Sequence, residues 1–166
     1  MDKYLQKLLD ENKGNITKQY QLVKVSNGTI REYILGEMAT AVKEGDQDAW
    51  YTLLDMTLAI NDQQIRVDIL NNLLIMPGHD RHQAITWEIQ KIQSPSSIPY
   101  IEQMLERGFT ALEYTCSENE TITKWFSHAL ASIHTPEAIE LINKFSHSDD
   151  PGVAKEMTYR LAKIKA

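Results

Sequence analysis

The sequence predicts an all-α fold, an α-solenoid made of a stack of antiparallel helix pairs, and three observations favour it. Apolar residues recur at intervals of three and four along most of the 166 residues, which is the period of an amphipathic helix. Only seven glycines and five prolines interrupt the chain, and they fall mostly between the periodic segments. The third observation is an internal repeat of about 40 residues, which is typical of helical-repeat proteins.

The periodic segments predict nine helices, several of which have recognisable ends. Asp46, Asp62 and Thr135 are expected to cap helix N-termini, because their side-chain oxygens can accept hydrogen bonds from the amides of a first turn. Pro136 suits a first helical position, where no amide hydrogen is needed. The predicted helices span residues 2–12, 29–43, 47–60, 62–76, 80–93, 96–107, 119–133, 136–147 and 152–165.

The internal repeat is visible in three octets, ITWEIQKI (85–92), FSHALASI (126–133) and MTYRLAKI (157–164). Each octet has large apolar residues at its first, fifth and eighth positions. Downstream of the first two octets, IQSPSSIPYIEQM (92–104) matches IHTPEAIELINKF (133–145) at an offset of 41 residues. Each unit is therefore expected to be a helix, a short turn with Ser or Thr before Pro, and a second helix.

Two helices per unit at this period resemble HEAT and armadillo repeats, and more specifically the short HEAT-like repeats of bilin lyases. The segments ALASIHTPEAIELINKFSHSDDPGVAKEMTYRLAKI (129–164) and DQQIRVDILNNLL (62–74) carry this resemblance. It implies about four repeats, which form one structural unit over residues 29–166, and it implies that Arg66 bonds back to a loop acid. Ala154 departs from the pattern, since the family often has arginine there. Residues 1–28 lie outside the resemblance and are expected to form an N-terminal helix and an irregular connection.

The net charge of −6 is unevenly distributed along the chain. Residues 1–31 carry six bases and three acids (+3), residues 32–80 two bases and nine acids (−7), and residues 81–166 nine bases and eleven acids (−2). A strongly negative stretch repels nucleic-acid phosphates and attracts basic protein surfaces. We therefore expect no direct nucleic-acid ligand, and either a basic protein partner or a solvated acidic face that keeps the protein soluble.

The sequence also bears on location. No apolar run reaches the roughly 18 to 20 residues of a membrane helix, and the start, MDKYLQKLLDEN, has acids where a signal peptide would be apolar. The single cysteine, Cys116, cannot form an internal disulfide, which fits a reducing compartment. We therefore expect a cytoplasmic protein with no membrane partner.

Residues with catalytic or metal-binding chemistry are few. His79 and His82, three residues apart, can share a metal on one helical face, but a polar helix entry explains the same pair and the spacing of other ligand types completes no site. Glu118 and Glu120 suit a helix N-terminus, where acids are favoured, and Cys116 has no neighbouring base. We therefore expect no catalytic residue, no metal, no cofactor and no enzyme activity.

The third position of each octet predicts a binding surface. Trp87, His128 and Tyr159 lie roughly 200° from the first apolar residue of their octets on a helical wheel, so stacked repeats would align them on one surface. Exposed aromatic residues in a row are typical of interface hot spots, although Trp87 filling a groove between repeats is the alternative. The charged residues expected to edge this row are Asp80, Glu88, Lys91 and Arg160.

The sequence also predicts core residues. Trp50 and Trp125 are expected to be buried because their neighbours in the sequence are apolar, and the helical wheel predicts the buried residues of the octets. The octet residues expected to be buried are Ile85, Ile89, Phe126, Leu130, Met157 and Leu161.

These observations favour a non-enzymatic protein-binding module. Its most specific version is suggested by a resemblance: small acidic helical-repeat proteins resemble immunity-type inhibitors, which bind and neutralise basic nuclease toxin domains through an acidic surface. The alternatives are a HEAT-like lyase, which the resemblance allows, and a scaffold or adaptor protein.

Overall fold

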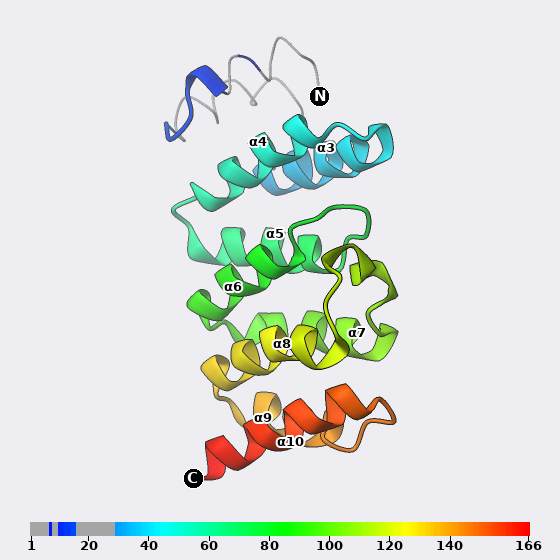
Figure 1. The fold of residues 1–166 in the computed structure, drawn as a ribbon. Coiled ribbons are helices and arrows are strands. Elements are labelled where there is room, and N and C mark those ends of the chain that lie inside the picture. The colour runs from blue at the N-terminus through cyan, green and yellow to red at the C-terminus, as the bar shows by residue number, and fades with distance from the viewer. Residues whose placement is uncertain (1–6, 8–9, 16–28) are drawn as a thin grey trace. The chain divides into compact units, whose positions relative to one another are not determined.

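The computed structural model describes residues 7, 10–15 and 29–166, and every regular element in these residues is a helix (Figure 1). The all-α prediction is therefore confirmed for the described chain. The α-helices are α3 (Ile30–Glu44), α4 (Gln47–Leu58), α5 (Gln63–Leu74), α6 (His82–Ile92), α7 (Ile98–Arg107), α8 (Asn119–Ile133), α9 (Pro136–Phe145) and α10 (Pro151–Lys165), and the 3₁₀ helices are η1 (Pro95–Ser97) and η2 (Thr110–Thr115). None of the described helices is long and apolar enough to cross a membrane.

The beginning of the chain is only partly covered by the described residues. Most of the predicted helix over 2–12 and the connection over 13–28 lie outside them, and so does the expected domain boundary at residue 28.

The predicted helix caps are confirmed. Asp46 Oδ1 accepts a hydrogen bond from the Ala49 amide at 3.0 Å, and Asp62 Oδ1 accepts from the Ile65 amide at 3.1 Å. Thr135 Oγ1 accepts from the Ala138 amide at 3.2 Å, directly before Pro136 in the first position of α9. These caps satisfy amides that the first turn of a helix leaves without partners, and they fix where α4, α5 and α9 begin.

The turns that follow α6 and α8 repeat the same backbone geometry. Gln93 and His134 end these helices in the left-handed conformation, with φ of 59° and 53°. The next residue in each turn, Ser94 or Thr135, is extended and caps the following helix, and a proline comes after it. Gln93 and His134 are 41 residues apart (134 − 93), so the offset seen in the sequence recurs in the backbone.

Two elements differ from the sequence prediction. Residues 110–115 form η2, which the apolar periodicity did not reveal because a 3₁₀ helix of six residues is too short to show a period. The helix predicted over 96–107 is divided into η1 and α7, since Ser94 caps the short first turn by accepting from the Ser96 amide at 3.3 Å.

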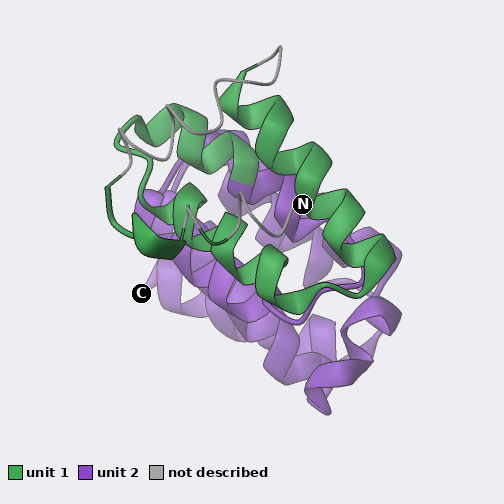
Figure 2. Ribbon diagram, turned by 90° about the horizontal axis from the view of Figure 1, so that it is seen from above, with its two compact units in different colours: residues 1–69 green, residues 70–166 purple. Residues whose placement is uncertain are grey.

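The described residues divide into two compact units, residues 1–69 and residues 70–166 (Figure 2), with the boundary inside α5. In the first unit α3 packs on α4, and Trp50 is buried as predicted. Arg31 and Asp68 form an ion pair between α3 and α5. Arg66 bonds back to a loop, as the resemblance implied, but the acceptor is the Ile60 carbonyl oxygen, at 2.6 Å, and not an acid.

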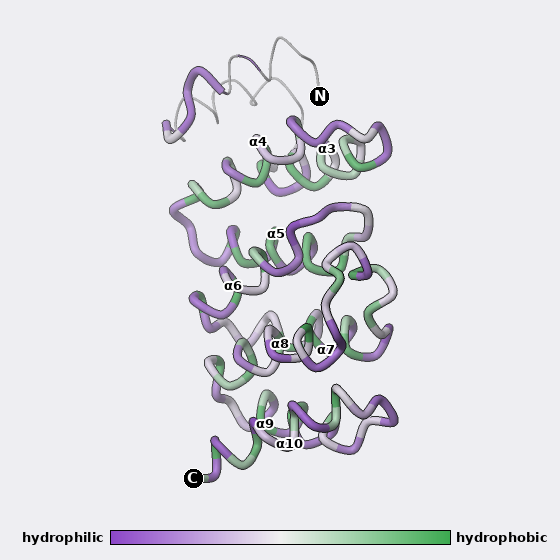
Figure 3. Tube along the Cα trace, in the orientation of Figure 1, coloured by the Kyte–Doolittle hydropathy of each residue, from purple (hydrophilic) through white to green (hydrophobic). Residues whose placement is uncertain are grey.

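In the second unit α8 packs between α6 and α10, and α9 contacts α7, α8 and α10. Apolar and polar residues are interleaved along each of these helices (Figure 3), and the apolar ones meet in the core. Five of the six octet residues predicted to be buried are buried: Ile85, Ile89, Phe126, Leu130 and Met157. The prediction is wrong for Leu161, which is half-buried because burial along α10, the last described helix, ends at Met157.

Gly152 lies at a close approach between α10 and α8. A Cβ atom at this position would lie 2.9 Å from the Glu120 backbone nitrogen, which is closer than real side chains come. Beside it, Asn119 Nδ2 donates a hydrogen bond to Asp150 Oδ2 at 2.5 Å, which links the N-terminus of α8 to the N-terminus of α10. A glycine is therefore required here by packing.

We predict that Gly152→Ala destabilises the protein by about 1–3 kcal/mol, because the added methyl group forces α10 away from α8. The matched control is Gly36→Ala in α3, where a Cβ would meet nothing within 4 Å. Since alanine favours helix over glycine, the control is expected to gain up to about 1 kcal/mol. Urea unfolding followed by circular dichroism measures both changes, and a Gly152→Ala protein as stable as the parent would contradict the packing requirement.

Candidate functional site

A groove of about 700 Å³ lies between α6 and α8 in the second unit. Its walls come from one stripe of each helix: residues 83, 87 and 90 of α6 and residues 121, 125 and 128 of α8, which follow the helical spacing of three and four. The residues that line it are Asp80, Arg81, Gln83, Ala84, Thr86, Trp87, Gln90, Thr121, Lys124, Trp125 and His128. The buried apolar stripes of α6 and α8 pack against each other in the core.

Two tryptophans give the groove its apolar surface. Trp87 is 56 % exposed, which is high for so large an apolar side chain. Trp125 was expected in the core, and this prediction is wrong, because its side chain is half-buried and lines the groove. The core stripe of α8 runs through Ile122, Phe126 and Leu130, whereas Trp125 shares a face with His128.

A buried carboxylate in the body of α10 links this helix to α8. Glu156 is 2 % exposed, and its Oε1 atom accepts hydrogen bonds from Ser127 Oγ at 2.7 Å and from Arg160 Nη2 at 3.1 Å. Arg160 Nε also donates to Ser127 Oγ at 3.3 Å. A buried charge is tolerated only when it is paired and hydrogen-bonded, as Glu156 is here.

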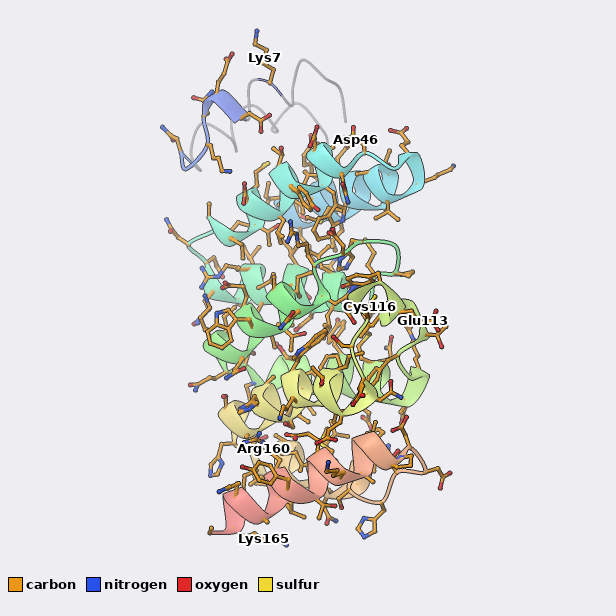
Figure 4. The ribbon with its side chains drawn as sticks, in the orientation of Figure 1. Lys7, Asp46, Glu113, Cys116, Arg160 and Lys165 are labelled. Carbon is orange, nitrogen blue, oxygen red and sulfur yellow. The ribbon has the colours of Figure 1, made fainter. Side chains whose placement is uncertain are left out.

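Arg160, labelled in Figure 4, connects this cluster to the groove, because its Nη2 atom lies 2.9 Å from Nε2 of His128. A guanidinium can only donate, so Nε2 is the acceptor and the ring proton of neutral His128 is on Nδ1. Burial lowers the pKa of His128, and the positive charge of Arg160 lowers it further. His128 therefore faces the groove region as a neutral imidazole with one N–H donor.

The structure brings together some of the sequence-predicted site residues. Trp87, His128 and Asp80 line the groove, and Arg160 contacts His128. Tyr159 is 50 % exposed but is not part of the groove lining; its ring lies 5.5 Å from the guanidinium carbon of Arg160.

The predicted charged edge is only partly at the groove. Glu88 and Lys91 form an ion pair at 2.7 Å and do not line it. Asp80 does, and it pairs with its neighbour Arg81 at 3.6 Å. Lys124 also lines the groove, and among the described residues no carboxylate forms an ion pair with it. Lys124 was not among the site residues predicted from the sequence, although its position three residues after Thr121 and four before His128 gives it the same face.

His79 and His82 lie near the groove but use their ring nitrogens within the protein. The rings stack, with centroids 3.8 Å apart. His79 Nε2 lies 2.8 Å from the Leu73 carbonyl oxygen, and its Nδ1 accepts from the Arg81 amide at 3.1 Å. His82 Nε2 lies 3.0 Å from the Met76 carbonyl oxygen, and its Nδ1 lies 2.9 Å from the Tyr114 hydroxyl. Among the described residues no group of three or more His, Cys, Asp or Glu side chains is placed to hold a metal ion.

Burial strongly favours the neutral form of these two histidines. It lowers the pKa of His82 to about 4, with a smaller contribution from the neighbouring His79, and it lowers the pKa of His79 as well. As the pH falls below about 6.5, the unfolded chain binds protons at these imidazoles more readily than the folded protein does. The contribution of these neutral histidines to the free energy of unfolding is therefore expected to be fully present above this pH and to be lost as the pH falls toward 4.

We predict that the free energy of unfolding decreases by up to about 3 kcal/mol between pH 7 and pH 4 through His82 alone. His82→Gln is expected to be less stable at pH 7 but to have a shallower pH dependence, since it removes one titrating group. His147→Gln, which changes an exposed histidine, is the control. Urea unfolding at a series of pH values measures the slopes, and equal slopes for the parent and His82→Gln would refute this assignment.

Comparisons of the chain with protein-family models, with curated protein sequences and with solved structures return no match. The function is therefore inferred from the residues of the groove and from the charges of the chain.

Proposed function

We propose that the protein is a non-enzymatic protein-binding module and that the groove between α6 and α8 receives its partner. The observation that carries this proposal is the 56 % exposed side chain of Trp87, at a groove also lined by Trp125. A tryptophan that loses its water contacts under a partner contributes a large apolar area with few rotors to immobilise, which is why this residue type dominates interface hot spots. The volume of the groove lies within the range of ligand-binding clefts.

The scaffold around the groove supports the same proposal. Its walls are helices whose opposite faces are buried in the core, and His128 is held by Arg160. Side chains fixed before binding lose less entropy when a partner arrives, which favours affinity. The order of contacts in the second unit, α6 on α8 and α8 on α10, also supports a HEAT-like stacking of helix pairs, and we include this arrangement in the proposal for that unit.

The more specific version, an immunity-type inhibitor of a basic toxin domain such as a nuclease, depends on a different part of the chain. Of the nine acids in residues 32–80, eight (all but Asp80) belong to the first unit. Glu44 and Asp48 are exposed there. Such acids would attract a basic partner and accelerate its association, and a cytoplasmic location is part of this version of the proposal.

We predict that Trp87→Ala keeps the helicity of the parent and binds the partner at least about tenfold more weakly, mainly through faster dissociation. The partner is first captured from a lysate on the parent protein, identified and purified, and isothermal titration calorimetry then gives the dissociation constants. Leu58→Ala, which truncates an exposed apolar residue of α4 outside the groove, is the matched control.

Two results would contradict this prediction. Unchanged affinity would exclude the groove as the binding site. A large loss of thermal stability would show that Trp87 is a packing residue, because an exposed side chain contributes little to the core.

The charge of the first unit is tested separately. We predict that the double variant Glu44→Lys and Asp48→Lys associates with the partner several-fold more slowly at low salt, with little change in dissociation rate. Glu113→Lys, an exposed acid of η2 in the second unit, is the control. Surface plasmon resonance at two salt concentrations measures both rates, and equal association rates for the double variant and the control would refute electrostatic steering by the first unit.

A further inference from the structure

We infer that the groove between α6 and α8 binds an acidic segment of the partner, in which an aromatic or large aliphatic anchor stands next to a carboxylate. This inference rests on the proposed protein-binding function and names the chemistry that the groove selects. It concerns the groove alone, whereas the steering of a basic partner concerns the acids of the first unit.

The hydrogen-bonding groups of the groove are mostly donors. The indole N–H groups of Trp87 and Trp125 and the ammonium group of Lys124 can only donate. His128 accepts from Arg160 through Nε2, so its remaining ring nitrogen, Nδ1, is a donor too. A ligand rich in acceptors, of which a carboxylate is the strongest, is therefore complementary to this lining.

The charges of the lining point the same way. Asp80 is the only carboxylate among the lining residues, and it is paired with Arg81, whereas Lys124 has no ion-pair partner among the described residues. The positive charges of Arg160 and Lys124 both contribute to the lowered pKa of His128, behind the larger effect of burial. A carboxylate of the partner placed beside Lys124 would be attracted by its positive charge. A lysine or arginine of the partner would be repelled by Lys124 and Arg160, and the one lining carboxylate, Asp80, is already paired with Arg81.

The anchor follows from the two tryptophans, and the polar residues fit a peptide backbone. Trp87 and Trp125 offer apolar surface to one large side chain. Gln83 and Gln90 line the α6 wall one helical turn to either side of Trp87, and each amide offers both a donor and an acceptor to an extended chain. The groove thus combines an apolar centre with a cationic side at Lys124.

The test selects ligands without knowledge of the natural partner. A phage-displayed library of random peptides of about twelve residues is selected on the 166-residue protein, and the enriched peptides are synthesised with a fluorescent label. Fluorescence polarisation then compares the parent with Trp87→Ala, Lys124→Glu and a control, Lys165→Glu, which reverses an exposed lysine of α10 outside the groove. Circular dichroism verifies that each variant is folded.

The expected result is enrichment of peptides that combine an aromatic or large aliphatic residue with Asp or Glu. Their affinity should fall at least about tenfold in Trp87→Ala and about tenfold in Lys124→Glu, and should be unchanged in Lys165→Glu. Their binding should also weaken as salt is raised, because opposite charges are screened. If Lys124→Glu does not fold, Lys124→Gln and the salt dependence of the parent still show whether the charge of Lys124 contributes to peptide affinity.

The other outcomes separate this inference from the proposed function. Enriched peptides that are neutral or basic and lose affinity in Trp87→Ala would contradict the acidic chemistry of the ligand but would keep the groove as a protein-binding site. The same conclusion would follow if acidic peptides bound with an affinity unchanged by salt and by Lys124→Glu. Failure to enrich any peptide, or peptides insensitive to Trp87→Ala, would overturn the inference together with the assignment of the groove.

Discussion

The packing of α6, α8 and α10 through their apolar stripes is the constraint on which the rest of the second unit depends. Ile85, Ile89, Phe126, Leu130 and Met157 are fully or nearly fully buried where these helices meet. Each helix presents one such stripe, so rotating it about its axis would expose apolar side chains and bury polar ones. Because the rotation is fixed in this way, the stripes that contain Trp87 and Trp125 are fixed as well, and they face the same groove.

A second constraint links the core to the groove. Glu156 is buried, and burying its charge requires the hydrogen bonds from Ser127 and Arg160. Arg160 is thereby held in one position, from which it also contacts His128. The orientation of a groove residue thus depends on how a buried acid on another helix is satisfied, and the charge of Arg160 adds to the burial that keeps His128 neutral. The properties of the groove therefore extend beyond the residues that line it.

The sequence was sufficient to predict the helices, their caps and most of the core, because periodicity and capping are local properties. It also placed Trp87, His128 and Asp80 at one site. It failed for Trp125, since an apolar neighbourhood in sequence does not reveal which face of the helix a residue occupies until the core stripe is known. It failed for Leu161 because burial depends on what covers a helix, and for η2 because six residues show no period. The contact of Glu156 with Ser127 joins residues 29 apart in the chain, so no local pattern indicated it, whereas helical spacing alone places Lys124 on the face of His128.

The turn shared by Gln93 and His134 has a consequence for how the chain can vary. In both places the backbone leaves one helix in the left-handed conformation, becomes extended at a capping hydroxyl residue and enters the next helix at a proline. In the helix-pair stacking proposed above, pairs entered and left through the same backbone geometry would be interchangeable modules, because each would contact mainly its neighbours. Insertion or removal of a whole pair would then perturb the protein less than insertion or removal of one or two residues within a helix, which would rotate every later side chain of that helix onto the wrong face.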